Sequence, residues 1–196
     1  MMFVQSYKQK IGILDFQGDI IEHINKFKTL NTSLKRIKYL EDLKEISHLI
    51  IPGGESTVIG RFLQSSGLFD TIKNKYAAGE LAIWGTCAGA ILLGKNSSPY
   101  SLELINVELD RNAYGSQIQS FSTQVQIPEL NTNMEAIFIR APKIKSVGQS
   151  DCSAKVLAEY EGSPILCQEN NILISTFHPE LTNSTIIEEY FLNLLS

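Results

Sequence analysis

Cys87 stands at the centre of the stretch whose chemistry is most distinctive. Gly85 and Gly89 flank it, and an apolar run continues on both sides, from Leu81 to Leu93. This run predicts a buried strand before the cysteine and the first turns of a buried helix after it. The two glycines would let strand and helix pass closely, as in the Gly-x-nucleophile-x-Gly elbow. A thiol at the positive end of a helix dipole is favoured as the thiolate, which attacks carbonyl carbons.

A histidine and a glutamate follow the last predicted strand, at residues 172–177. Residues two apart in extended backbone point the same way, so His178 and Glu180 can lie side by side. A carboxylate beside an imidazole fixes its tautomer and favours its protonated form, as a general base serving a thiol requires. His23 and His48 have no carboxylate so placed in the sequence.

Two further features could bind a substrate near the cysteine. Residues 52–57 contain two glycines that free the backbone to turn its N–H groups outward, at a helix start that Ser56 or Thr57 could cap. Outward N–H groups stabilise negative charge. Arg111 and Arg140 each follow a predicted strand, and the planar guanidinium suits a carboxylate.

Each of these features has an ordinary structural explanation when taken alone. Cys87 could be a core residue, because free cysteine is among the most buried residue types. The glycine-rich stretch could be a plain strand-to-helix turn, the arginines surface residues, and the His-Pro-Glu string a capping turn. Together, however, they form one constellation suited to acyl transfer from an amide, and the chance agreement of all parts is much rarer than a single match.

The first half of the chain follows a rhythm of strands and helices that must position these residues. Apolar runs predict strands at 10–16, 34–39 and 48–51. Helical spacing predicts helices at 20–30, which Asp19 could cap, at 41–46, and through Ile59, Phe62 and Leu63. This alternation indicates a parallel sheet with helices on both faces.

The second half is rich in strands. They are predicted at 102–109, 121–127, 135–139, 154–160, 164–168 and 172–177, before a final helix capped by Asn183 or Ser184. These strands should extend the sheet in antiparallel fashion or add a small flanking sheet. The predicted fold class is therefore α/β: a three-layer, open, mostly parallel sheet with helices on both faces and additional antiparallel strands. Because no linker or repeat is present, we expect one domain over residues 1–196.

The composition limits the kinds of partner that the protein could bind and the cellular compartment in which it could work. The chain has 196 residues, of which 43% are hydrophobic, and a formal net charge of −4. The charge offers no general attraction to nucleic acid or anionic membranes. Three cysteines without close pairing argue against a disulfide framework and for a reducing compartment. Neither a signal peptide nor a membrane-spanning stretch is recognisable, so a cytoplasmic location is expected.

Five strings, in order along the chain, resemble the glutaminase subunits of pyridoxal 5'-phosphate synthase. They are Pro-Gly-Gly-Glu-Ser-Thr at 52–57, Gly-Thr-Cys-Ala-Gly at 85–89, Arg-Asn-Ala-Tyr-Gly at 111–115, Phe-Ile-Arg-Ala-Pro at 138–142 and Phe-His-Pro-Glu-Leu at 177–181. Class I glutamine amidotransferases at large share the elbow and the His-Pro-Glu, whereas the other strings point to the vitamin B6 branch. The chain departs from the family pattern around Gln17-Gly18, at Asp15 and Phe16, and again at Ser116.

The resemblance implies hydrolysis of L-glutamine to L-glutamate and ammonia. Cys87 would attack the carboxamide carbon and form a γ-glutamyl thioester, His178 would transfer the protons, and Glu180 would orient His178. Backbone N–H groups of Gly54 and Ala88 would form the oxyanion hole. The family positions that hold glutamine correspond here to Gly54, Glu55, Ser56, Arg111, Ile139 and Arg140.

The resemblance also implies a partner, because ammonia must reach its acceptor unprotonated. In the family this partner is the synthase subunit, a (β/α)8 barrel that makes pyridoxal phosphate within a large hetero-oligomer. No pyridoxal phosphate, metal or nucleotide is expected on this chain, since it lacks a Walker glycine loop and a metal-spaced Cys/His cluster. Two alternatives stay open: an amidotransferase subunit that feeds another pathway, and a silent docking subunit, which the intact triad disfavours.

Overall fold

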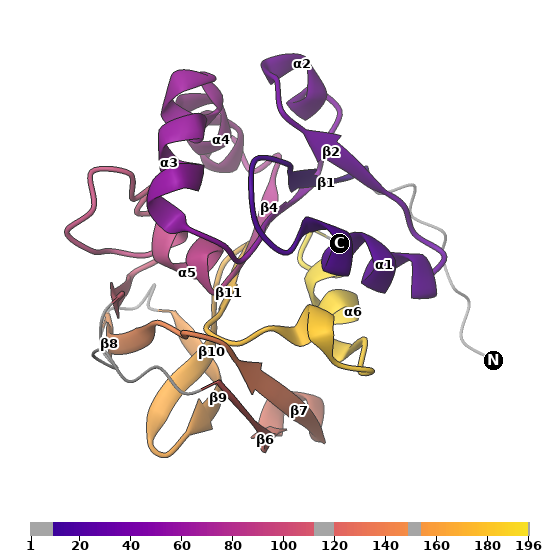
Figure 1. Ribbon diagram of the computed structural model, residues 1–196, viewed down its shortest axis with the longest axis vertical. Helices are drawn as coiled ribbons and strands as arrows, with labels where there is room; N and C mark the ends of the chain where they lie inside the picture. The colour runs from indigo at the N-terminus through magenta and orange to yellow at the C-terminus, as the bar shows by residue number, and fades with distance from the viewer. Residues whose placement is uncertain (1–9, 112–119, 149–153, 196) are drawn as a thin grey trace.

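A seven-stranded sheet forms the centre of the computed structural model, which describes residues 10–111, 120–148 and 154–195. Its order is β2-β1-β3-β4-β11-β10-β9 (Figure 1). The strands are β1 (Ile11–Leu14), β2 (Leu34–Ile37), β3 (His48–Ile51), β4 (Ala82–Thr86), β9 (Lys155–Tyr160), β10 (Ser163–Glu169) and β11 (Ile172–Ser175). The first five strands in the order are parallel, β10 pairs antiparallel with β11, and β9 pairs antiparallel with β10.

Helices cover both faces of this sheet, and each face has its own apolar core. Neighbouring residues of one strand belong to different cores: Ile50 packs with α1 (Ile20–Thr29) and α6 (Ile186–Leu192), whereas Ile51 packs with the helices on the opposite face. Those helices are α3 (Ser56–Ser65), α4 (Leu68–Ala77) and α5 (Ala88–Leu93). Burial on both faces explains why the central strands are continuous apolar runs.

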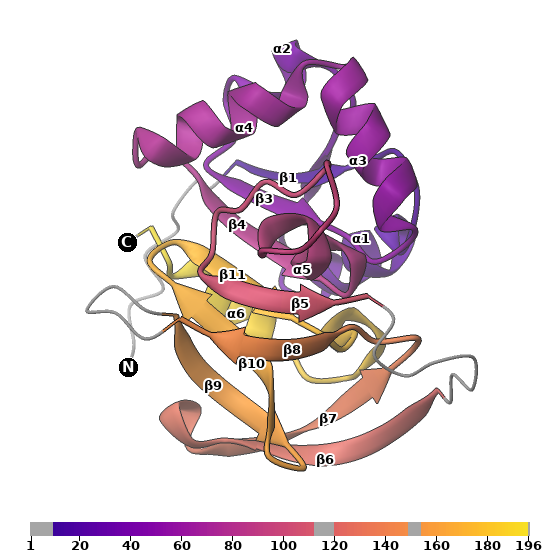
Figure 2. The same ribbon diagram turned by 90° about the vertical axis from the view of Figure 1, so that its left-hand side faces the viewer.

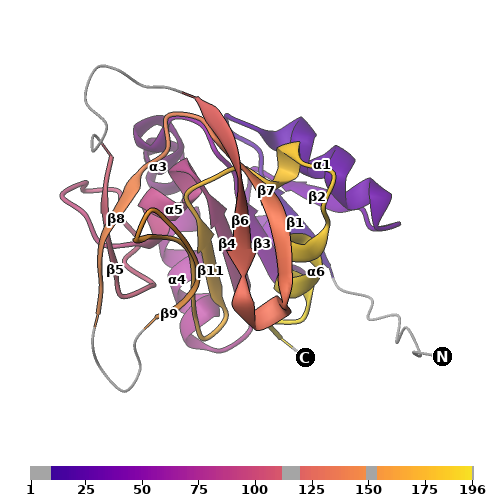
Figure 3. The same cartoon turned by 90° about the horizontal axis from the view of Figure 1, so that it is seen from below.

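Short elements and two small antiparallel sheets complete the described chain. β5 (Val107–Asp110) pairs with β8 (Lys143–Val147), and β5 contacts α5 while β8 contacts β10 (Figure 2). β6 (Phe121–Ile127) pairs with β7 (Thr132–Phe138) as a hairpin (Figure 3). The remaining elements are α2 (Leu40–Leu43), η1 (Pro128–Leu130) and η2 (Pro179–Leu181). No helix within the three described ranges combines the length and apolarity needed to span a membrane.

The predicted fold class is confirmed, and both expected uses of the later strands occur together. β10 and β9 extend the main sheet beyond β11, which joins it as a parallel strand, whereas β5 to β8 form the two small sheets. The predicted strand at 102–109 is wrong in its first half, because only Val107–Asp110 is a strand. Leu102 N–H and Leu104 N–H instead donate to the last carbonyls of α5, so this apolar segment closes the helix end. The sequence prediction also missed α4 and β8.

The helix caps differ from those predicted. The Glu55 side chain, rather than Ser56 or Thr57, caps α3 by accepting a hydrogen bond from Thr57 N–H at 3.1 Å. Asp19 occupies the N-cap position of α1 but makes no side-chain cap bond. Thr185 is the N-cap residue of α6, although Ser184 Oγ accepts from Ile186 N–H at 3.4 Å. The carboxylate of Asp19 is therefore available for another contact.

Two glycines make the turn between β4 and α5 possible. A Cβ on Gly89 would lie 2.0 Å from the Ile51 carbonyl oxygen, and a Cβ on Gly85 would lie 2.5 Å from the Gly89 carbonyl carbon. Both distances are far below van der Waals contact. The predicted close passage of strand and helix around Cys87 is thus confirmed, and β3 contacts the same turn.

Glu188 is a fully buried carboxyl group in the first turn of α6. Burial raises the pKa of Glu188 to about 7, although its own backbone N–H and the charge of Lys26 act in the opposite direction. The folded protein therefore holds a proton that the unfolded chain releases between pH 4.5 and about 7. The folded state therefore loses stability as the pH rises through that range, and the loss levels off above about pH 7.

We expect Gly89→Ala to lower the free energy of unfolding by about 2 to 4 kcal/mol, since the methyl group must displace the backbone of β3. Urea denaturation followed by circular dichroism measures this change. Gly79→Ala is the matched control: Gly79 also resists substitution, with φ +73°, but nothing lies within 4 Å of its Cβ position. Its cost should be about 1 kcal/mol. Equal losses in the two variants would contradict the close approach.

Glu188→Gln should make the protein relatively more stable at high pH. Wild type loses free energy of unfolding as pH rises from about 4.5 to 7, whereas the amide variant lacks this ionisation. The advantage of the variant should therefore grow across that window by up to about 3 kcal/mol and then level off. Urea unfolding at pH 5 and pH 8 tests this, with the exposed neighbour Glu189→Gln as control. A pH-independent difference would refute the assignment.

Candidate active site

Cys87 occupies a strained backbone position between β4 and α5. Its φ is +47° and its ψ is −99°, a region that residues other than glycine rarely adopt. Its N–H donates to the Ser175 carbonyl at 2.8 Å, which ties the turn to β11. The side chain lies 3.8 Å from the Ile139 carbonyl oxygen, measured from Sγ, and the residue is 8% exposed. The thiol is thus nearly buried and held by neighbouring strands.

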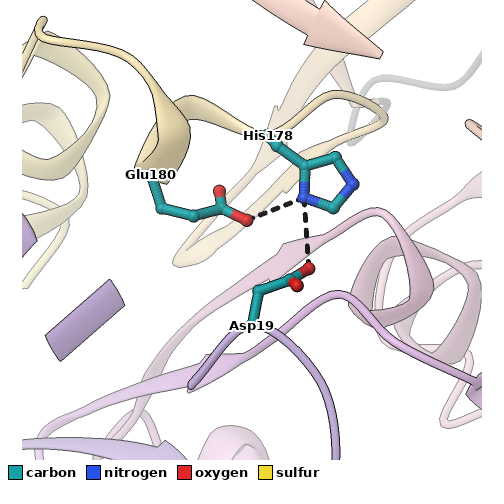
Figure 4. Close-up of side chains that lie close together, drawn as sticks. All are labelled: Asp19, His178 and Glu180. Carbon is teal, nitrogen blue, oxygen red and sulfur yellow. Dashed lines mark hydrogen bonds and ion pairs between the residues drawn. The ribbon is translucent and has the colours of Figure 1, made fainter. Parts of the chain in front are cut away.

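His178 and Glu180 lie next to each other, as the sequence predicts. His178 Nδ1 and Glu180 Oε1 are 2.7 Å apart, and both side chains are buried (Figure 4). The β6–β7 hairpin helps to place them, because His178 N–H donates to the Ile137 carbonyl at 2.9 Å. Glu180 itself belongs to η2, the short turn that follows the histidine.

The charges at this pair favour a protonated imidazole. Burial alone would lower the pKa of His178, but hydrogen bonds to the Cys87 and Glu180 side chains outweigh it and raise that pKa to about 10. Burial likewise would raise the pKa of Glu180, but the neighbouring His23 and His178 rings hold it below its usual value. The Cys87 side chain therefore faces an imidazolium, the partner that a general base of a nucleophilic cysteine provides.

The predicted oxyanion residues directly follow the residues that meet the imidazole and carry the thiol, since Gly54 follows Gly53 and Ala88 follows Cys87. Gly54 has φ +145°, and a Cβ on Gly53 would lie 2.7 Å from His178 Cε1, so the glycine turn comes directly against the imidazole. Gln17 Oε1 accepts a hydrogen bond from Glu55 N–H at 2.7 Å, which supports the turn from the other side. Ala88 follows Cys87 as the first residue of α5.

The residues expected to bind glutamine fall into two groups. Arg111 donates to Glu55 Oε1 and to Thr57 Oγ1, each at 2.8 Å, at the start of α3, where Ser56 is buried. The carbonyl oxygen of Ile139 contacts the Cys87 sulfur. Arg140, the next residue, is exposed and has a φ of +47°. The other residues of the Arg-Asn-Ala-Tyr-Gly string, together with Ser116 and Cys152, lie outside the described residues.

One face of α1 supports the site, which the sequence analysis missed. The sequence places no carboxylate two residues after His23, but the fold brings one close: His23 Nε2 is 3.7 Å from Glu180 Oε1 and 3.2 Å from Thr86 Oγ1. Lys26, further along α1, donates to the Thr182 carbonyl. Asp19, His23 and Lys26 follow the spacing i, i+4, i+7 of a single helix face, but this spacing does not say whether the face turns inward or toward solvent. Burial lowers the pKa of His23.

A metal ion could in principle be held where Asp19, His178 and Glu180 meet. One ligand atom from each lies within 4.8 Å of the others. The same three side chains also form a protonated imidazole between two carboxylates. The distance of 2.7 Å between His178 Nδ1 and Glu180 Oε1 is that of a strong hydrogen bond. We therefore interpret the group as a hydrogen-bonded cluster. A thiol, a base with its carboxylate, and a glycine turn are what acyl transfer from an amide requires.

Known proteins similar to the chain agree on one family. The model of the SNO glutamine amidotransferase family matches residues 13–196. The pyridoxal 5'-phosphate synthase subunit PdxT of Caldicellulosiruptor bescii is 47% identical over 92% of this chain and 95% of its own length. The same subunit of Clostridium acetobutylicum is 41% identical over 94% of this chain and 100% of its own.

One solved structure agrees with this family, and a more distant one agrees in fold. One described as a glutamine amidotransferase has a TM-score of 0.88 and 36% identity, and covers 94% of this chain and 98% of its own. PurLQS from Thermotoga maritima, at 15% identity and a TM-score of 0.70 over 97% of this chain and 100% of its own, shares the fold alone. On the family match and these relatives, the chain belongs to the SNO glutamine amidotransferase family.

Proposed function

We propose that this chain hydrolyses L-glutamine to L-glutamate and ammonia and supplies the ammonia for synthesis of pyridoxal 5'-phosphate. The similarity to pyridoxal 5'-phosphate synthase subunits supports the pathway. The observation that carries the chemistry is the placement of Cys87, in a strained turn, against a histidine whose Nδ1 lies 2.7 Å from Glu180.

The first half of the proposed reaction forms a thioester. The Cys87 thiolate attacks the carboxamide carbon, and the carbonyl oxygen takes the negative charge and accepts hydrogen bonds from the N–H groups of Gly54 and Ala88. Each such donor contributes about 3 to 4 kcal/mol in related chemistry. The His178 imidazolium gives its proton to the nitrogen as the C–N bond breaks. Ammonia and a γ-glutamyl thioester result, and His178 is left neutral.

The second half releases glutamate. Neutral His178 takes a proton from water, whose oxygen attacks the thioester carbon. The new tetrahedral species collapses as the C–S bond breaks, giving glutamate and restoring the thiolate beside an imidazolium. Glu180 accepts the hydrogen bond from Nδ1 throughout, so that Nε2 stays directed at the sulfur and substrate.

Glutamine binding is proposed at the ion pair of Glu55 and Arg111. The α-ammonium and α-carboxylate of glutamine carry opposite charges, so the amino acid can meet Glu55 with one group and Arg111, with Arg140, using the other. Arg111 and Glu55 now neutralise each other, with Nη2 and Oε1 2.8 Å apart, and bound glutamine would give each of them a partner of opposite charge. Gly54, Ser56 and Ile139 would line the path to the sulfur.

A synthase subunit completes the proposal. Ammonia that escapes to solvent is protonated and loses its nucleophilicity, so a (β/α)8 synthase subunit is expected to dock and receive it within a hetero-oligomer. We propose that residues 1–196 form one glutaminase domain that works in the cytoplasm without a metal or cofactor of its own.

Cys87→Ala should abolish ammonia release from glutamine, by about 1,000-fold or more, because no other group forms the thioester. The assay mixes the chain with its cognate synthase subunit and measures both ammonia and pyridoxal phosphate. Cys167→Ala is the control, since Cys167 is fully buried in β10 and burial raises its pKa to about 12.

Three outcomes of this assay are informative. Equal ammonia release from wild type and Cys87→Ala would overturn the nucleophile assignment. No release from either would favour a silent docking subunit. Ammonia release without pyridoxal phosphate formation would point to an amidotransferase subunit of another pathway.

Arg111→Gln should raise KM for glutamine about 10- to 100-fold and leave kcat within about threefold, because the lost contact binds substrate and transition state alike. Steady-state kinetics across glutamine concentrations separate the two parameters. Arg61→Gln is the matched control, as Arg61 is an exposed arginine whose Nε donates to the Tyr100 hydroxyl. A KM for Arg111→Gln within about twofold of wild type would contradict the proposed role.

A further inference from the structure

A second carboxylate faces the candidate base. Asp19 Oδ2 lies 3.3 Å from His178 Nδ1, the same ring nitrogen that lies 2.7 Å from Glu180 Oε1 (Figure 4). The two carboxylates come from different elements, Glu180 from η2 and Asp19 from the start of α1. The imidazole edge is therefore bordered by two acids.

Helix capping does not explain the orientation of Asp19. An aspartate at the N-cap position ordinarily accepts hydrogen bonds from the first free N–H groups of the helix. Here the side chain makes no such bond and is turned toward His178 instead. The backbone of Asp19 is fixed separately, since its N–H donates to the Gly53 carbonyl at 3.2 Å.

The contact also involves the glycine turn. A Cβ on Gly53 would lie 2.5 Å from Asp19 Oδ2 and 2.7 Å from His178 Cε1. Only a glycine leaves room for the carboxylate and the ring to meet at this point. Three chain segments, at residues 19, 53 and 178, thus converge on one side of the imidazole.

The two carboxylates have different physical roles. The single Nδ1–H can make one strong hydrogen bond, and the shorter distance gives that bond to Glu180, which is fully buried. Asp19 acts through its charge, and because its side chain is 36% exposed, solvent weakens that effect. Burial raises the pKa of Asp19, and the imidazolium of His178 opposes this increase.

We propose that Asp19 is a positioning residue that stabilises the imidazolium form of His178 and so sets the upper pH limit of the reaction. This inference rests on the proposed glutaminase function. Among the described residues, the charged and titratable groups that act on the ring are Cys87 at the elbow, Glu180 in η2, and Asp19 and His23 on α1, with Glu22 acting on Asp19 and His23. Among the carboxylates of this set, Asp19 and Glu180 are the two that contact the ring.

Asp19→Asn removes the charge and keeps the shape of the side chain. The pKa of the His178 imidazolium should then fall by roughly 0.5 to 1 pH unit, as loss of a charge at this distance in a partly hydrated site predicts. The alkaline limb of kcat/KM for glutamine should move to lower pH by the same amount, and KM should stay near that of wild type. Asp19→Glu should restore part of the shift.

The matched control is Glu22→Gln, which removes the same charge one helical turn away. It should shift the limb by less than about 0.2 pH unit, because Glu22 does not contact the ring. Both variants are first compared with wild type by urea unfolding. An alkaline limb of Asp19→Asn that coincides with that of Glu22→Gln would overturn the inference.

A readout that needs no turnover separates this inference from the proposed function. NMR titration of the His178 ring nitrogens reports the ring pKa directly, and the pH dependence of Cys87 alkylation by iodoacetamide reports the ionisation of the neighbouring thiol. If wild type proves inactive toward glutamine and the ring pKa still falls in Asp19→Asn, the proposed function fails and the contact stands. If wild type is active and the ring pKa does not move, Asp19 has no such role.

Discussion

The parallel register of β3, β4 and β11 is the constraint on which the rest of the structure depends. Gly85 of β4 pairs with Ile51 on one side and with Ile174 on the other. The carboxyl ends of the three strands therefore stop at the same edge of the sheet. The glycine turn follows the first, Cys87 the second and His178 the third. Segments far apart in sequence meet because their strands are neighbours, the usual location of ligand sites in open α/β sheets.

Close backbone packing keeps this edge in place. The carbonyl of Ile51 touches α5 at Gly89, and the carbonyl of Ser175 accepts from Cys87 N–H at 2.8 Å. The strained φ of Cys87 persists because strands on both sides fix the turn. A polar face of α1 adds a second support, through His23 beside Glu180 and Lys26 at the Thr182 carbonyl. The candidate nucleophile and base thus rest on rigid elements rather than on long loops.

Much of this arrangement could be predicted from the sequence because the signals are local. Cys87 directly follows an apolar strand, His178 comes three residues after the end of another, and the glycines around Cys87 admit few conformations other than a close turn. The support from α1 could not be predicted in the same way. His23 and Lys26 sit among alternating polar and apolar residues, and a polar residue on an amphipathic helix is as consistent with solvent as with a buried partner. Only the fold shows which face turns inward.

The errors in the second half have a related cause. The apolar residues Leu102 and Ile105 suited a strand, but they are buried by covering the end of α5 without pairing. β8 has one fully buried residue, Ile144, and its other apolar residue, Val147, is only partly buried; because the two are three positions apart, they give no period-two alternation. Residues buried in a paired strand and residues buried in a loop are both apolar, so the sequence does not distinguish the two.

The shared strand edge also governs which changes of chain length the protein can accept. Leu173 and Ile174 now face opposite sides of the sheet. Deleting one residue within β11 would shift the register so that each faces the wrong side, and it would draw the histidine away from the sulfur. A longer loop before the amino-terminal end of any of these strands leaves their register unchanged. Insertions and deletions among natural homologues should therefore concentrate in the loops at that end of the sheet, and a second protein is best fused there.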